Sequence, residues 1–178
     1  MNFTGPLALL VAWVVHDIEE AIAFPAECDR LADRAGIEFL RMGRRQSWAA
    51  VGFMGLLLVA PICAAGFRTT GRSGQYRAMV AGLEGHVVTH ALSAVAQRRY
   101  TAGVITALTV MWPGARLARH ELSRSGHPLR PRDYFAGAML LLPAAITSQV
   151  LARLVQEGAR APRRHRRSST KRFSGRRG

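Results

Sequence analysis

The sequence predicts an all-α fold, a multi-pass transmembrane helix bundle of about five spans. Two observations carry this prediction. The chain of 178 residues is 49% hydrophobic yet has a formal net charge of +14, and its charged and apolar residues are segregated. Residues 46–67 and 134–152 contain no charged side chain, and a helix needs roughly 20 apolar residues to cross a bilayer core. A basic nucleic-acid-binding protein would mix its arginines into amphipathic elements, so we expect the lipid bilayer, and no nucleic acid, as the partner.

Three further apolar stretches complete the predicted bundle. The first of the five spans is interrupted by a polar run at residues 16–20, and the second contains Pro61, which a membrane helix tolerates as a kink. The fourth span is short, and snorkelling of Arg116 or Arg119 to the interface can extend it. In chain order the expected spans are residues 6–24, 48–67, 78–97, 100–115 and 134–154.

Lysine and arginine are distributed unevenly between the connections, and this sets the expected orientation. With the N-terminus outside, the arginine-rich connection at residues 25–47 and the C-terminal tail both lie on the cytoplasmic side, as the positive-inside rule requires. That connection is either an amphipathic interfacial helix broken near Gly36 or a solvated segment. We predict a transmembrane helical domain at residues 1–158 and a disordered basic tail at residues 159–178. The tail either binds anionic lipid headgroups or only reinforces the topology.

Ionisable side chains lie within two of the expected spans, where each costs roughly 2.5 kcal/mol or more on insertion scales. In the first span Glu19 and Glu20 follow His16 by three and four residues, so both carboxylates lie beside the imidazole on one helix face. In the third span His86 and His90 are four residues apart and share a face. In the predicted orientation His16 and His90 lie at similar depth near the middle of the bilayer, which is necessary if the two groups are to meet.

Spacing alone leaves three interpretations of this group open. Its mixed nitrogen and oxygen ligands suit zinc, iron or manganese, and two carboxylates offset the charge of a divalent ion. The same residues can instead form a polar network that fixes helix packing, or a proton or ion relay. Glu84 lies on a different side of the third span from His86, so we expect it outside the group, paired with Arg77 or with a residue at a helix interface.

The polar run and a later motif together resemble a known family. The run at residues 16–20, whose letters are HDIEE, resembles the signature of the HXXEE family of bacterial integral membrane proteins. That family also carries a histidine in a later span, followed by a Tyr-x-Pro-Gly motif. Here His90 is followed by the letters YTAG at residues 100–103. Ala102 replaces the proline, which puts a rigid turn into the fourth span in doubt, because proline would fix φ near about −65° there. The likeness covers roughly residues 5–115.

The resemblance implies a protein of the bacterial plasma membrane and suggests a metal-dependent enzyme. The residues that match the family's motif positions are His16, Glu19, Glu20 and His90, whereas His86 rests on helical spacing only. We expect His16, Glu20 and His90 to hold a divalent ion, with Glu19 as a further ligand or as general base. A hydrolase and an oxidative enzyme acting on a lipid-soluble substrate both fit.

Tyr100 and two other functions complete the expectations. Tyr100 either positions a substrate or serves as an interfacial aromatic anchor. The polar residues of the spans can belong to a small proton- or ion-coupled transporter, in which they act as a relay. The chain can also be a non-catalytic membrane scaffold whose basic tail docks a partner.

Overall fold

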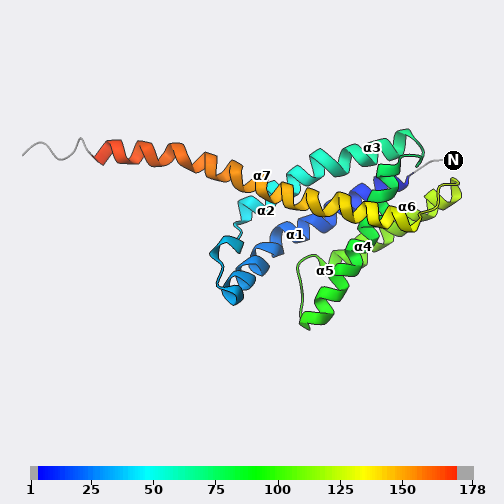
Figure 1. Cartoon of the computed structure of the whole chain (residues 1–178), viewed down its shortest axis with the longest axis horizontal. Helices are drawn as coiled ribbons and strands as arrows, with labels where there is room; N and C mark the ends of the chain where they lie inside the picture. Colours follow the sequence, from blue (N-terminus) through cyan, green and yellow to red (C-terminus); the bar gives the residue numbers. More distant parts are fainter. Residues whose placement is uncertain (1–3, 172–178) are drawn as a thin grey trace, which may run out of the picture.

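The computed structural model describes residues 4–171, with side chains described as far as residue 158, and all regular secondary structure in this part of the chain is helical (Figure 1). Two of its long helices contain a short π-helical stretch, which widens one turn without ending the helix. In chain order the elements are α1 (Gly5–Ala35), the 3₁₀ helix η1 (Glu38–Leu40), α2 (Arg44–Met54), the π-helix η2 (Gly55–Val59), α3 (Ala60–Arg68), α4 (Gly74–Gln97), α5 (Val104–Thr106), the π-helix η3 (Ala107–Met111), α6 (Trp112–Arg124) and α7 (Pro131–Lys171).

Each expected apolar stretch lies largely within a helix, and two helices are long and apolar enough to cross a membrane. These are Arg44–Arg68, which joins α2, η2 and α3, and Pro131–Gly158 of α7. That finding rests on length and composition. The all-α class is therefore confirmed for the described residues, while passage of the other three stretches through a bilayer stays a prediction.

The fourth helical stretch begins and ends later than predicted. It starts at Val104 instead of Tyr100, because Gly103 adopts a left-handed φ of 83° and the chain turns into the helix there. It continues through η3 and α6 to Arg124, well beyond the expected end at Ala115. The stretch that looked short for a span is thus part of a longer helix with a polar end.

The predicted connection and tail are partly helical. α1 continues beyond the first expected span and ends at Ala35, where Gly36 takes a left-handed φ of 66°. α7 continues beyond residue 158 to Lys171, in keeping with the favourable helix propensity of arginine. The predicted boundary therefore lies within α7, and the division into a membrane domain and a disordered basic tail stays a prediction. Residues 172–178 of the predicted tail lie outside the described residues.

The helices enclose a core between α1, α4 and α6, and α7 lies across α2 and α4 (Figure 1). The largest fully buried apolar side chains are Tyr76, Leu9, Met79, Leu83, Met111 and Leu122. Large apolar side chains also face outward, among them Leu56 at 75% exposed, Val95 at 75% and Leu142 at 62%. Helices that are apolar on their outer as well as their inner faces are typical of membrane spans.

Glu84 pairs with residues across two helix interfaces, as one of the two expectations had it. The alternative expectation, a pair with Arg77, is wrong. The side chain of Glu84 is 5% exposed, and its Oε2 accepts hydrogen bonds from Arg119 Nη1 at 3.1 Å and from the Tyr134 hydroxyl at 2.6 Å. Arg77 lies instead with its Nε 3.9 Å from Asp133 Oδ1. Glu84 thus joins α4 to α6 and α7, and it stays outside the histidine cluster, as expected.

Candidate metal centre

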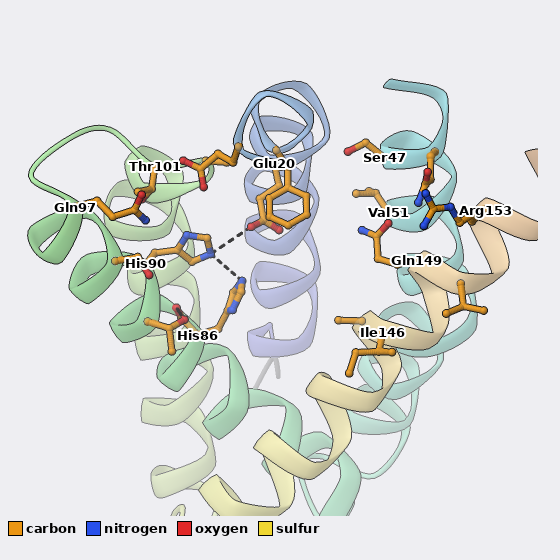
Figure 2. Close-up of a pocket in the computed structure, with 18 of the residues that line it drawn as sticks. Glu20, Ser47, Val51, His86, His90, Gln97, Thr101, Ile146, Gln149 and Arg153 are labelled. Atoms are coloured by element: carbon orange, nitrogen blue, oxygen red, sulfur yellow. Dashed lines mark hydrogen bonds and ion pairs between the residues drawn. The ribbon is translucent and has the colours of Figure 1, made fainter. Parts of the chain in front are cut away.

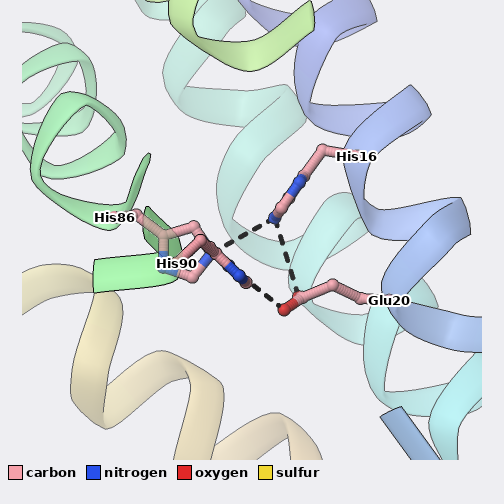
Figure 3. A group of neighbouring side chains, drawn as sticks. All are labelled: His16, Glu20, His86 and His90. Atoms are coloured by element: carbon pink, nitrogen blue, oxygen red, sulfur yellow. Dashed lines mark hydrogen bonds and ion pairs between the residues drawn. The ribbon is translucent and has the colours of Figure 1, made fainter. Parts of the chain in front are cut away.

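Four candidate ligand residues converge from two helices. α1 supplies His16 and Glu20, and α4 supplies His86 and His90 (Figure 3). Their ligand atoms all lie within 4.8 Å of one another. His86 Nε2 lies 3.3 Å from His16 Nε2 and 3.0 Å from His90 Nε2. Glu20 completes the set, with Oε1 3.4 Å from His90 Nε2 and Oε2 4.0 Å from His16 Nε2. These four residues form the His/Glu group.

Helical spacing and burial together explain the group. Each helix contributes two residues four positions apart, which therefore share a face. The side chain of His16 is fully buried, and those of His90 and Glu20 are 10% and 23% exposed. The rings of His16 and His90 have centroids 4.8 Å apart. The structure thus brings together residues of the two predicted spans, including His86, for which spacing was the only argument.

Thr106 at the start of the fourth helical stretch orients the ring of His16. The Thr106 hydroxyl donates to Glu19 Oε2 at 2.5 Å, so its oxygen is left to accept a hydrogen bond. His16 Nδ1 lies 3.2 Å from that oxygen and therefore carries the proton. His16 Nε2 then keeps its lone pair and faces the His/Glu group. A hydrogen-bonded partner that fixes the tautomer of a histidine in this way is common around metal ligands.

Glu19, which we expected as a ligand or as general base, lies outside the His/Glu group. Its Oε1 accepts a hydrogen bond from the Tyr100 hydroxyl at 2.6 Å, and its Oε2 accepts one from the Thr106 amide at 2.8 Å. That amide belongs to the first turn of a helix, where N–H groups have no partner within the helix. Because both oxygens are engaged, Glu19 holds the loop before α5 in place and orients Thr106.

Tyr100 belongs to the same chain of hydrogen bonds. The phenol hydroxyl is the donor in its 2.6 Å hydrogen bond to Glu19 Oε1. Its ring is 46% exposed, which leaves the expected role as an interfacial anchor compatible with this position. Its hydroxyl points to Glu19 and not to the His/Glu group.

Two residues important for the group were missed by the sequence analysis. Thr106 lies within the expected span at residues 100–115, and no local pattern links it to His16. Gly103 approaches so closely that a Cβ added there would lie 2.7 Å from His16 Cε1 and 2.9 Å from His90 Cε1. The sequence does carry a signal for Gly103, because the chain retains the glycine of the resembled Tyr-x-Pro-Gly motif while the proline is lost.

Two hollows lie beside the His/Glu group. The outer hollow, of about 570 Å³, is lined at its rim by Ser47, Thr101 and Arg153 (Figure 2). The inner hollow, of about 510 Å³, lies between α1, α2, α4 and α7 and is lined mostly by apolar side chains, with Asp17 and a few uncharged polar residues such as Thr89 and Ser148 among them. Glu20 and His86 line both hollows. Volumes of this order hold small-molecule ligands, and the group stands where the two hollows meet.

Replacing Glu19 with glutamine is expected to weaken metal binding at the His/Glu group about 10- to 100-fold, the range seen when a residue behind a metal ligand is changed. Glutamine offers an NH₂ donor where the carboxylate accepts, so one of the donors on Tyr100 and Thr106 loses its partner. His16 then loses its fixed orientation. Zinc affinity of the purified protein, measured by competition with a chelating dye, tests this.

Glu27→Gln is the matched control for that change. Glu27 lies two turns further along α1, paired with Arg30 at 3.3 Å and outside the His/Glu group. Its zinc affinity should equal that of the wild type. Equal affinities for Glu19→Gln and the wild type would show that Glu19 does not position His16.

Comparison with known proteins gives one match. A family model described as a protein of unknown function with an HXXEE motif matches residues 7–118, more than half of the chain. No curated protein and no solved structure matches the chain. The matched segment contains the polar run of α1, both histidines of α4 and the turn at Gly103. The chain therefore belongs to the HXXEE family, whose function is unknown.

Proposed function

We propose that the protein is a metal-dependent enzyme of the membrane, acting on a lipid-soluble substrate at the His/Glu group. The membrane location is supported by the two helices that are long enough to span. Only 28% of the most apolar segment of Arg44–Arg68 and 17% of that of Pro131–Gly158 is buried inside the protein. The core helix of a soluble protein is mostly buried, whereas these two helices turn most of their apolar surface outward. With the N-terminus outside, the outer hollow would open toward the cytoplasmic side.

The observation that carries the proposal is the convergence of three imidazole nitrogens on one point. His16 Nε2 has no proton, so the contact of 3.3 Å between His16 Nε2 and His86 Nε2 becomes a hydrogen bond if His86 Nε2 carries a proton. The same nitrogen then has no lone pair for His90, 3.0 Å away. Protons alone therefore leave one close contact unsatisfied. A cation at the centre satisfies all three lone pairs at once.

The distances within the group also suit a metal ion. Around zinc with ligand bonds of about 2.0–2.1 Å, tetrahedral ligand atoms are about 3.3–3.4 Å apart. Three of the contacts in the group measure 3.0, 3.3 and 3.4 Å. Zinc therefore fits the donor set well, and iron or manganese are alternatives because nitrogen and carboxylate ligands suit them too.

Glu20 is the residue we assign to the reaction. Its Oε2 lies 4.0 Å from His16 Nε2, farther than either printed contact between histidine nitrogens, and it lines both hollows. The three histidines then hold the ion, while Glu20 acts as an exchangeable ligand or as general base toward a reactant. A divalent ion in such a site polarises a carbonyl or lowers the pKa of water. Hydrolysis and oxidative chemistry are both consistent with this donor set.

A second candidate function, a proton relay, has one observation in its favour. An unbroken series of polar contacts runs from Glu19 through Thr106 and the histidines to Glu20. Such series carry protons in membrane transporters. The relay requires no metal, and this separates it from the enzyme.

Replacing His86 with alanine is expected to remove the metal. Wild-type protein in detergent, reconstituted separately with zinc, iron(II) and manganese, should retain about one ion per chain of at least one metal. His86→Ala should retain less than about one tenth of that, because the residue contacts both other histidines. Elemental analysis after desalting measures both. Loss of metal-dependent products from a polar lipid extract, detected by mass spectrometry, should accompany it.

His120→Ala is the control, since His120 is an exposed histidine of α6 outside the His/Glu group. It should load metal as the wild type does. Wild-type protein that retains none of the three metals would overturn the enzyme proposal. Proton flux into liposomes that His86→Ala abolishes would then support the relay.

A further inference from the structure

Asp17 is a buried carboxylate without a partner. Its side chain lines the inner hollow and the residue is 7% exposed. No hydrogen bond or ion pair joins it to another residue in the described part of the chain. Burying a carboxylate in apolar surroundings without a partner is costly, and within a membrane such a residue points to a ligand or an ion. The His/Glu group does not use it.

The surroundings of Asp17 decide which kind of partner fits. Inorganic cations such as magnesium and calcium need several oxygen ligands, and the largely apolar inner hollow offers Asp17 as its one carboxylate outside the His/Glu group. Those neighbours include Trp13, Leu141 and the ring of Tyr134, whose hydroxyl is occupied by Glu84. Aromatic rings attract ammonium groups. A carboxylate outside the His/Glu group, in a largely apolar hollow with aromatic rings, is therefore complementary to an ammonium carried on an apolar body.

We propose that the inner hollow binds a lipophilic amine, and that such an amine is the substrate of the enzyme proposed above, on which the catalytic part of this inference rests. The ammonium pairs with Asp17, and the apolar body lies along α4 and α7. Glu20 and His86 line the same hollow, so the bonds near the nitrogen face the metal group. The volume of about 510 Å³ lies in the range of small-molecule sites.

Two substitutions test separately whether binding depends on the carboxylate charge of Asp17 and on the free volume of the inner hollow. Asp17→Asn keeps the shape of the side chain and removes the carboxylate charge. Gly85→Leu fills the hollow, because Gly85 lines it and a Cβ added there meets nothing within 4 Å. Gly52→Leu is the matched control for the second change. Gly52 is also a helical glycine whose added Cβ meets nothing within 4 Å, and it lines neither hollow.

The experiment is competitive photolabelling in phosphatidylcholine nanodiscs. The probe is a twelve-carbon primary amine with a photoreactive diazirine in its chain, and unlabelled dodecylamine, dodecanol and dodecanoate compete with it. We expect labelling of peptides from α4 and α7, with dodecylamine competing at least about tenfold more strongly than dodecanol. Asp17→Asn should abolish that tenfold preference. Gly85→Leu should suppress labelling, and Gly52→Leu should label like the wild type.

The outcomes distinguish this inference from the proposed function. Equal competition by dodecylamine and dodecanol in the wild type, or an unchanged preference in Asp17→Asn, overturns the amine site. Labelling that Gly85→Leu leaves unchanged overturns the placement in the inner hollow. Metal content is measured in the same samples. Amine preference in a wild-type protein that retains no metal supports the binding site and overturns the enzyme.

Discussion

Replacing Gly103 with alanine is expected to abolish metal binding at the His/Glu group. The added Cβ would lie 2.7 Å from His16 Cε1 and 2.9 Å from both His90 Cε1 and Glu20 Cγ. Three of the four candidate ligand residues would therefore have to move. The left-handed backbone at φ 83° adds about 1–2 kcal/mol of strain for any residue with a Cβ. Zinc content and the thermal unfolding midpoint, measured together in detergent, test the two effects.

Gly126→Ala is the control that has the backbone strain of Gly103→Ala without its close contact with the candidate ligand residues. Gly126 has a similar φ of 78°, but a Cβ added there meets nothing within 4 Å. It should lower the free energy of unfolding by the same about 1–2 kcal/mol and leave zinc content unchanged. If Gly103→Ala retained its zinc and matched Gly126→Ala in every respect, the close approach of this loop to the ligands would be refuted.

Replacing Gly137 with alanine is expected to loosen α7 from α4 and to give the largest loss of stability. A Cβ on Gly137 would collide with the carbonyl oxygen of Ala78 and would lie 2.7 Å from Gly82 Cα. Both of these are backbone atoms, which cannot swing aside as a side chain can. Overpacking usually costs about 1–3 kcal/mol, and a collision with backbone lies at the upper end. Small residues at such crossings let membrane helices approach closely.

The expected loss of stability is opposite in sign to the usual effect of replacing a helical glycine with alanine. Alanine favours a helix over glycine by about 1 kcal/mol, so an alanine with free space around it should not destabilise α7. Gly158→Ala provides that case, since Gly158 lies on the same helix and its added Cβ meets nothing within 4 Å. Gly137→Ala should unfold at a lower temperature than the wild type and Gly158→Ala should not. Equal midpoints would rule out the close α4–α7 contact.

The helices and the shared faces were predictable because they depend on local sequence. The apolar stretches place all five helical regions, and the four-residue spacings place His16 with Glu20 and His86 with His90. Spacing does not distinguish Glu19 from Glu20, because both lie on the same side as His16. Only the position of the loop before α5 shows that Glu19 is taken by Thr106 while Glu20 faces the histidines.

The helix ends were predicted less well, again for physical reasons. Hydropathy ends a span where polar residues begin, but a helix continues while its backbone hydrogen bonds can form. α6 therefore runs on through charged residues to Arg124. The turn at Gly103 was missed as a helix start because its left-handed backbone depends on glycine and on packing against the ligands.

The sequence by itself determined the all-α class of the described residues, two helices long and apolar enough to cross a membrane, and two polar faces, on α1 and on α4. These properties follow from composition and from the 3.6-residue period of a helix. The tertiary structure alone decided that the two polar faces meet, that Thr106 orients His16, and that Asp17 lines a largely apolar hollow with no partner among the described residues. Residues far apart in the chain are brought together by side-chain packing across helices, which no local spacing records.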